Sequence, residues 1–433
     1  MRTGIRNIMV GVSTAGLLLA GRTPSTAQTL QQRVEDLEKK VDTQQKSIAD
    51  SLGIKFHGVV AIDYQYDINA PDGSGATNAS FGPVALRAFE NEKNSVMANL
   101  ANLHVERQPD SGLGFVFDFD FGKTADVVNN STYFGRHNGN DPIPGNGTDF
   151  FDARQFYLTY TVPVGSGIKL KAGRFVTLAG EEVIKAYNNI NYNVSNSILF
   201  GFAIPFTHTG LMASYSVMDQ LSFDLGLVNG WDAVSDNNDG KSFHGGVTIA
   251  PDPKFSTYTS LTYGPEQNLN GQSKRFLATT VFTVKPIDQL TLLFEYDYGN
   301  ESNVSLTSPV GPDATSTTML YRAAGNKDWQ GAAAYAVVAP TDDWQIALRG
   351  EVFDDPDGVR TLFQQGVTTN DPHVRGPGAD FWEFTPTLSY KLADGLWWRN
   401  EYRHDESDKK FFPQGDHFAK GQDTVTTELI YTF

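Results

Sequence analysis

The chain has 433 residues, a formal net charge of −16, 41 glycines and no cysteine. The absence of thiols excludes disulfide bonds and metal sites built on thiolates, and the acidic balance argues against nucleic-acid partners, which attract basic proteins. No run of 18 or more apolar residues follows residue 27, so the sequence predicts no transmembrane helix.

The first 27 residues have the pattern of a secretory signal peptide. Arg2 and Arg6 precede a mostly apolar stretch at 8–20, which is too short to span a bilayer as a helix. Small residues at 25–27 suit a signal peptidase, and we expect cleavage after Ala27. Loss of the three arginines in this segment would change the net charge from −16 to −19. A disordered tail that happens to be apolar is the alternative.

Residues 28–53 predict a short periplasmic coiled coil. Apolar residues recur there at spacings of four and three, with Gln44 at one position where an apolar residue is expected. They are Leu30, Val34, Leu37, Val41 and Ile48. This pattern covers about three heptads, and a single helix of that length is marginal alone, so it implies partner helices. A trimeric stalk is one interpretation; an amphipathic helix packed on its own protein is the other.

From Lys55 onward no helical period persists, and the side chains alternate at period two. Residues 113–121 show this most clearly, because one leucine and four phenylalanines alternate there with glycine, valine and two aspartates. The pattern predicts sixteen strands, an even number, as single-chain bacterial barrels have. They span 55–66, 97–108, 112–122, 153–163, 168–176, 207–217, 221–230, 242–250, 255–263, 274–285, 290–299, 328–338, 344–352, 380–391, 396–404 and 422–433.

The connections alternate strictly between short turns and longer polar loops. Five of the loops run to roughly 25–30 residues, which compact soluble domains rarely tolerate. They lie near 67–96, 123–152, 177–206, 300–327 and 353–379. An outer-membrane barrel has short periplasmic turns and long extracellular loops. The predicted fold is therefore all-β: a transmembrane antiparallel 16-stranded up-and-down β-barrel over 54–433, with both termini on the periplasmic side.

The two faces of the predicted strands differ in polarity. Sixteen strands enclose a lumen wide enough for water, and the residues expected to face it are polar or charged. They include Thr291, Glu295, Asp297, Gln345, Arg349, Glu351, Glu383, Thr385, Thr387, Ser389, Lys391, Arg399, Glu401 and Arg403. The outward partners are apolar and often aromatic, as contact with lipid requires. They include Leu292, Phe294, Trp344, Ile346, Trp382, Phe384, Trp398 and Tyr402.

The last predicted strand, 422–433, favours the same compartment. Leu429, Tyr431 and Phe433 share one of its faces and are expected to meet lipid, whereas Glu428 lies on the opposite, water-facing side. Few soluble proteins end on an exposed aromatic residue, because terminal residues usually fray in water. We expect this strand to pair with both the preceding strand and the first one, which would close the barrel.

Catalytic alternatives rest on scattered residues. The acid pairs Asp118/Asp120 and Glu295/Asp297 could act as in a glycosidase, but acids that line a wet wall are the favoured explanation. Four histidines lie on separate strands, and their spacing does not predict a shared metal ion. They are His57, His104, His208 and His244. No Gly-x-Ser-x-Gly, glycine-rich phosphate loop or His-Glu-x-x-His motif occurs, so we expect no enzyme.

Two acidic segments, 236–240 and 354–358, are rich enough in oxygen ligands to consider calcium. Neither has the spacing of an EF-hand loop, and solvated turns rich in Asp, Asn and Gly are the favoured explanation. No other cofactor is predicted. A lipase on the outer surface would need a serine, a histidine and a polar partner there, whereas the outward faces are apolar.

Loop 177–206 is the most informative connection. It carries three charged residues and then many apolar ones, which would be unfavourable in bulk water. Folding into the barrel would bury them and narrow the pore, and charged loop and wall residues would form a selectivity ring. The candidates for this ring are Lys169, Lys171, Arg174, Glu181, Glu182, Lys185, Glu295, Asp297, Arg349, Glu351, Arg399, Glu401 and Arg403. The alternative is that the loop covers a subunit interface or packs at the rim.

Several segments resemble one known family. They are Gly173-Arg174-Phe175, Gly180-Glu181-Glu182, the stretch 191–210 with Pro205-Phe206-Thr207-His208-Thr209-Gly210, and Val228-Asn229-Gly230-Trp231-Asp232. Together they are similar to the OmpL-like putative β-barrel porin family, over most of the chain after about residue 55. The resemblance implies an outer-membrane channel without catalytic residues, and a role for Phe433 in recognition by barrel-assembly machinery. Residues 28–53 look more like the amino-terminal coiled coil of phosphate-selective porins.

The sequence thus predicts an outer-membrane porin that admits small hydrophilic solutes and ions by passive diffusion. The expected partners are membrane lipid, lipopolysaccharide and two further copies of the chain in a homotrimer, and nucleic acid is not among them. A barrel with a plugged lumen that serves as a surface-binding or adhesion scaffold is the alternative, and an outer-membrane hydrolase is a third, weaker one.

Overall fold

This computed structural model describes residues 33–35, 37–41, 51–69, 84–90, 92–131, 150–304, 325–361, 378–414 and 417–433. The chain divides into two units, Met1–Gly53 and Ile54–Phe433. In the first unit, residues 33–35 and 37–41 are helical. The predicted signal peptide and the heptad residues Leu30, Gln44 and Ile48 lie outside the described residues, so the coiled coil stays a prediction.

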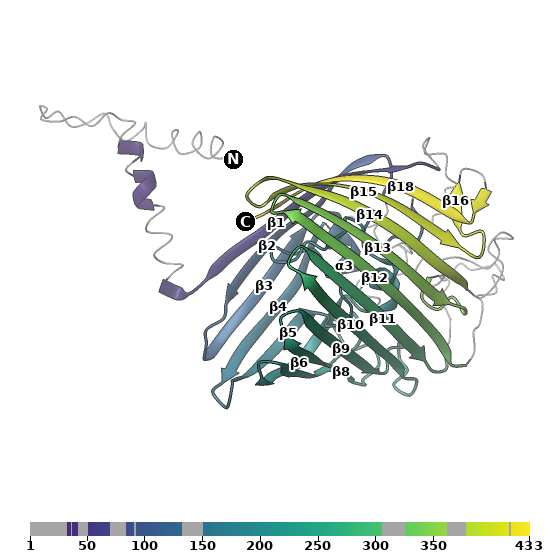
Figure 1. Ribbon diagram of the computed structural model, residues 1–433. Coiled ribbons are helices and arrows are strands. Elements are labelled where there is room, and N and C mark those ends of the chain that lie inside the picture. The colour runs from purple at the N-terminus through teal and green to yellow at the C-terminus, as the bar shows by residue number, and fades with distance from the viewer. Residues whose placement is uncertain are drawn as a thin grey trace, which may run out of the picture. The chain divides into compact units, whose positions relative to one another are not determined.

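The described residues of the second unit form a closed antiparallel barrel of sixteen strands (Figure 1). The strands are β1 (Lys55–Asp67), β2 (Ser95–Arg107), β3 (Gly112–Phe121), β4 (Phe151–Val162), β5 (Ile168–Val176), β6 (Thr207–Met218), β7 (Leu221–Val228), β8 (Ser242–Asp252), β9 (Phe255–Gly264), β10 (Arg275–Ile287), β11 (Leu290–Glu301), β12 (Lys327–Thr341), β13 (Trp344–Asp355), β14 (Ala379–Ala393), β15 (Leu396–Ser407) and β18 (Gly421–Thr432). This confirms the predicted fold class and strand count.

β18 closes the barrel by pairing with both β1 and β15, as the sequence predicts. Val60 lies opposite Tyr431 in the ladder between β1 and β18. The last residue continues this ladder: the N–H of Phe433 donates to the carbonyl of Gly58 at 3.0 Å, and the N–H of Gly58 donates to the carbonyl of Phe433 at 2.9 Å. The ring of pairings satisfies the strands' backbone groups within the protein, which a lipid environment requires.

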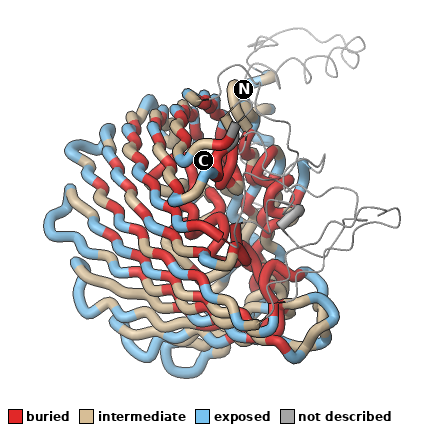
Figure 2. The backbone as a smooth tube through the Cα atoms, turned by 90° about the vertical axis from the view of Figure 1, so that its right-hand side faces the viewer, coloured by how far each residue is buried: buried red, intermediate tan, exposed pale blue. Residues whose placement is uncertain are grey.

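Exposure alternates along many of the strands, as the burial colouring of the wall shows (Figure 2). Phe115, Phe117 and Phe119 of β3 lie on the outer face, where their ring centroids are 5.1 and 6.1 Å apart. The residues between them, Asp118 and Asp120, are buried on the inner face. The period-two pattern therefore places an aromatic ladder toward lipid and carboxylates toward the lumen, as expected.

Several strands extend past their predicted ends. The prediction ends β13 at 352 and β15 at 404, whereas the structure ends them at Asp355 and Ser407. Apart from Phe353, these added residues are polar, so hydrophobic alternation does not reveal them, yet their backbones still pair across the sheet.

Three short elements within the connections also escape the sequence pattern. They are the helix α3 (Lys123–Ser131), the π-helix η1 (Leu199–Ala203) and the hairpin of β16 (Phe412–Gln414) and β17 (His417–Ala419). All are too short for a hydrophobic period to emerge. Most of the predicted loops near 67–96, 123–152, 300–327 and 353–379 lies outside the described residues.

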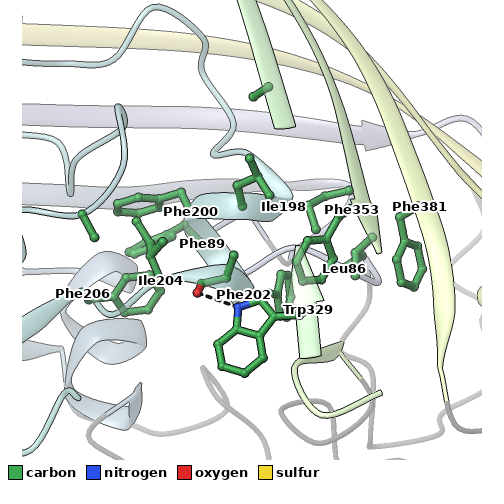
Figure 3. Close-up of a cluster of buried hydrophobic side chains, with 14 of the residues drawn as sticks. Leu86, Phe89, Ile198, Phe200, Phe202, Ile204, Phe206, Trp329, Phe353 and Phe381 are labelled. Carbon is green, nitrogen blue, oxygen red and sulfur yellow. Dashed lines mark hydrogen bonds between the residues drawn. The ribbon is translucent and has the colours of Figure 1, made fainter. Parts of the chain in front are cut away.

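An apolar cluster fills part of the barrel interior, near the strand ends that carry the long loops (Figure 3). Phe200 and Phe202 of loop 177–206 belong to it, together with the inward wall residues Trp329, Phe353 and Phe381. The indole N–H of Trp329 donates to the carbonyl of Ala203 at 3.1 Å. The prediction of a water-filled lumen did not anticipate this cluster, which forms because the inward residues at these strand ends are aromatic.

Gly58 occupies a crowded position where the first and last strands close the barrel. A Cβ there would lie 2.7 Å from the carbonyl oxygen of Asn102 and would contact the ring of Phe433. We expect Gly58→Ala to destabilise the barrel by about 1–3 kcal/mol, the usual cost of overpacking. The measurement is the urea concentration at which half of the barrel is unfolded, followed by the different gel mobilities of the folded and the heat-denatured protein. Gly350→Ala is the matched control, since its Cβ would meet its nearest atom at 3.8 Å. Equal midpoints would contradict the prediction.

Candidate functional site in the barrel lumen

Loop 177–206 binds the inner wall through its backbone. Glu401 of β15 accepts the amide N–H groups of residues 194–195 at 2.6 and 2.9 Å. Glu351 of β13 accepts those of residues 198–199 at 2.6 and 3.1 Å. Each carboxylate thus holds two consecutive amides, much as an acidic cap holds the first amides of a helix. These contacts satisfy buried amides that have no strand partner.

Arginines of the wall hold carbonyl groups of the same loop. Guanidinium groups suit this task because each offers five donors in a rigid plane. The contacts join Arg154 to the carbonyl of Lys185 (2.9 Å), Arg349 to that of Ser195 (2.7 Å), Arg399 to those of Ile190 (3.2 Å) and Asn191 (3.1 Å), and Arg403 to that of Asn196. The wall therefore binds both the backbone N–H groups and the backbone carbonyl groups of the loop.

Glu182 extends the contact into a network of charges. Its carboxylate lies 2.7 Å from Arg349, which also pairs with Glu383 of β14 at 2.8 Å. The hydroxyl of Tyr335 donates to Glu182 at 3.3 Å. All four side chains are buried. Both carboxylates contact the Arg349 guanidinium, and Glu383 also lies 3.6 Å from Arg403, so each carboxylate has a cationic partner inside the protein.

Lys185 joins a positive charge of the loop to β18, the strand that pairs with β15. Its Nζ lies 2.6 Å from Glu428, whose other oxygen is 2.8 Å from Arg399. Burial alone would lower the pKa of Lys185, but attraction by Glu428 and Glu90 outweighs burial and raises the pKa. The ammonium group therefore stays charged at neutral pH. Breaking such a buried pair by removing one partner typically costs about 3–5 kcal/mol.

Most of the predicted ring residues meet at this loop, and their role in selectivity stays a prediction. They bind one another or the loop's backbone, which leaves few of them available to solutes. These residues are Glu182, Lys185, Glu295, Arg349, Glu351, Arg399, Glu401 and Arg403. Asp297 lies on the same wall, buried and without an ion pair to any described residue.

The three predicted cations of β5 lie apart from that network. Lys171 lies over the rings of Tyr157 and Phe175, with Nζ 4.8 and 5.1 Å from their centroids. Arg174 donates to Asp152 at 2.8 Å. Lys169 is exposed. β5 directly precedes the loop, and the loop then runs to the far wall, so these residues do not join the pairs formed there.

Sequence reasoning missed several residues of the site. Arg87 binds Asp405 at 2.6 Å, and the guanidinium of Arg360 donates to the carbonyl of Phe202 at 2.6 Å. Arg154 was not among the candidates either, although it contacts the loop. Arg87 and Arg360 lie outside the barrel strands, where the period-two pattern gives no signal about direction. A β-bulge in the ladder between β3 and β4 disturbs the alternation near Arg154.

The histidines come together in pairs, which corrects the expectation that they are scattered. The rings of His208 and His244 have centroids 4.0 Å apart and meet across β7, where Gly226 lies opposite His244. His57 and His104 flank Tyr187 of the loop, with centroid distances of 4.2 and 4.8 Å. Inward side chains on different strands can lie close together in the lumen, and the spacing of residues along the sequence does not reveal this.

The described residues contain no group of three or more His, Asp or Glu side chains that could hold a metal ion. In the segment 354–358, Asp355 instead accepts the backbone N–H groups of residues 359–361 at 2.8 to 3.0 Å. In the segment 236–240, Asp236 accepts the N–H of Asn238 at 2.9 Å. Both segments therefore use their carboxylates to shape turns, which is the explanation that the sequence favours.

A family model described as "Putative beta-barrel porin-2, OmpL-like" matches residues 53–433. The chain belongs to this family. It is therefore a porin of the bacterial outer membrane, in agreement with the resemblance found in the sequence. No helix of the described part is long and apolar enough to cross a membrane. No curated protein matches the chain.

Solved structures share the fold at low sequence identity. An anion-selective porin from Comamonas acidovorans matches with a TM-score of 0.53 and 10% identity, over 88% of this chain and 99% of that one. The outer membrane channel DcaP of Acinetobacter baumannii has a TM-score of 0.52 and 11% identity, over 88% and 97%. OmpT of Vibrio cholerae has 0.51 and 9%, over 88% and 97%. At these identities the similarity is one of fold.

Glu401→Gln tests how the wall holds the loop. A glutamine presents one accepting oxygen and one donating amide, so it cannot accept both N–H groups of residues 194–195. Hydrogen bonds to a charged group contribute about 1.5–3 kcal/mol, and we expect cleavage of the loop by protease to become roughly tenfold faster or more. The measurement is limited proteolysis of the folded barrel. Glu106→Gln, near the periplasmic end of β2, is the control. Equal cleavage rates would contradict the prediction.

Proposed function

We propose that this porin is a passive diffusion channel for small hydrophilic solutes and that loop 177–206 narrows its lumen. The observation that carries the proposal is the set of contacts that tie the loop to β11, β13, β14, β15 and β18. A loop fixed at so many points keeps a constant shape, as a size-selective passage requires. Solutes then cross down their gradient without any conformational change.

The charges that remain unpaired decide which solutes pass. Within the described residues, Glu181 of the loop, Asp297 of β11, and Lys169 and Lys171 of β5 make no ion pair. Glu182, Lys185 and the wall arginines do. Unpaired charges of opposite sign orient dipolar solutes and set the relative permeability of cations and anions. The paired charges keep the loop in place.

The apolar cluster favours a second candidate, a surface-binding or adhesion scaffold with a plugged lumen. Phe200, Phe202, Trp329 and Phe353 are buried together on the long-loop side of the lumen. If such packing extended across the whole section, no solute would pass, and only the outer surface would act. Electrical conductance separates the two candidates.

Planar bilayers give the deciding experiment. Purified protein should insert in discrete steps and carry steady ion current in KCl, and liposomes that contain it should swell in small polar solutes. Lys185→Ala removes one anchor of the loop and leaves Glu428 with Arg399, so we expect greater current noise and a changed conductance step. Asp394→Ala, on an exposed turn, is the control. Repeated insertion without current would overturn the channel and support the scaffold.

Glu181 should make ion selectivity depend on pH. Burial, together with the neighbouring charge of Glu182, raises the pKa of Glu181 to about 7. The carboxyl is neutral below that pH and negative above it, so cation selectivity should increase as the pH rises from about 5.5 to about 8.5. The reversal potential in a KCl gradient measures this change. Glu181→Gln should keep the low-pH value throughout. A wild type whose reversal potential ignores pH would contradict the assignment.

We further propose that the porin assembles as a homotrimer through the heptad segment 28–53. The barrel would contact membrane lipid and lipopolysaccharide. The spacing of its apolar residues supports this, as does the helical state of residues 37–41. Deletion of residues 28–53 should weaken assembly while the barrel still folds, because strand pairing alone closes it. Native mass spectrometry in detergent measures both. A wild type that is monomeric at every detergent concentration would contradict the stalk.

A further inference from the structure

We propose that the lumen contains a binding site for a small neutral sugar, on the periplasmic side of loop 177–206. The inference rests on the proposed channel, since it names the class of solute that the channel takes. The site is a cavity of about 400 Å³ between the loop and the wall of β12–β15. That volume lies in the range of small-molecule sites and suits one or two sugar rings.

Two aromatic rings provide the apolar surface of the cavity. Trp397 of β15 and Tyr192 of the loop both line it, and both are partly exposed. Trp397 also packs against the buried cluster of Val59, Ala61 and Ile430, which fixes the position of the indole. The face of an aromatic ring is electron-rich and attracts the weakly positive C–H bonds that line one side of a sugar ring.

Hydrogen-bonding groups without internal partners surround these rings. Gln345, Ser389 and Asn188 line the cavity, and their side chains form no hydrogen bond to any residue that the structure describes. The same holds for the Tyr192 hydroxyl and the Trp397 indole. An amide side chain can donate to one hydroxyl and accept from another, which matches the paired hydroxyls of a sugar.

The charges at the cavity argue against an ionic ligand. Arg399 is neutralised by Glu428 at 2.8 Å, and Glu182 by Arg349 at 2.7 Å. Only Glu181 lacks an ion pair among the described charged residues that line the cavity, and burial raises its pKa to about 7. A free anion would find no unpaired cation there, and a cation would meet a carboxyl that is partly protonated. A neutral ligand with many hydroxyls fits best.

The position of the cavity follows from the wall residues. Gln345 and Trp397 are each the second residue of their strand, close to the short turns before β13 and β15. Short turns face the periplasm in outer-membrane barrels. Asn188 and Asn189 are exposed and lie in a turn of the loop, which an isolated antiparallel β-bridge between Ala186 and Asn189 closes. A solute therefore reaches the site on the inner side of the loop, before it enters the periplasm.

Binding can be tested apart from conduction, by titrating the detergent-solubilised full-length porin with maltose in saturation-transfer NMR and by isothermal calorimetry. Trp397→Leu should weaken maltose binding about tenfold or more, because it removes the stacking surface. Trp398→Leu is the matched control: this neighbouring indole lies on the outer face, 45% exposed, and its loss should leave the affinity unchanged. Gln345→Ala, which removes no packed ring, should also weaken binding several-fold.

Gluconate and arginine serve as charged competitors of similar size. The proposal predicts that neither displaces maltose at equal concentration. Tighter binding of either one, or maltose binding that ignores both Trp397→Leu and Gln345→Ala, would overturn it. Ion current without any maltose binding would overturn the sugar site and leave the channel standing. Maltose binding without any current would overturn the channel and support the site.

Discussion

The structure depends on one constraint: every backbone N–H and C=O removed from water needs a partner within the protein. In the wall, strand pairing meets this need, and the closing contact between Gly58 and Phe433 completes the ring. In the lumen, loop 177–206 has no strand to pair with. Side chains of the wall take the place of that strand, with Glu351 and Glu401 as acceptors and arginines as donors.

This constraint explains how the barrel uses its charges. A wall of acids and bases would attract and sort ions if those side chains were free. Here most of the charged residues that face the loop are engaged with its backbone or with one another, as in the network of Glu182, Arg349 and Glu383. In the proposed channel, the residual charges and the polar and aromatic groups that make no internal contact would determine which solutes the lumen accepts. Under that proposal, one set of residues holds the loop and another selects the solute.

The sequence predicted the wall well because period two acts locally. Alternation at 113–121 directly encodes which side chains meet lipid, and the apolar face of 422–433 predicts the pairing of β18 with β1 and β15 that the structure shows. The apolar content of loop 177–206 also indicated burial. The contacts inside the lumen could not be predicted from the sequence, because they join residues far apart in the chain. Arg87 and Asp405 are 318 positions apart, and no local pattern relates them.

Amide hydrogen exchange tests the central claim most directly, because it reports whether the loop's N–H groups are bonded. In the full-length porin, the amides of residues 194–195 and 198–199 should exchange as slowly as those in the strands. Glu401→Gln should speed exchange at residues 194–195 and leave residues 198–199, held by Glu351, protected. Exchange at all four amides as fast as in the exposed turns would contradict the account.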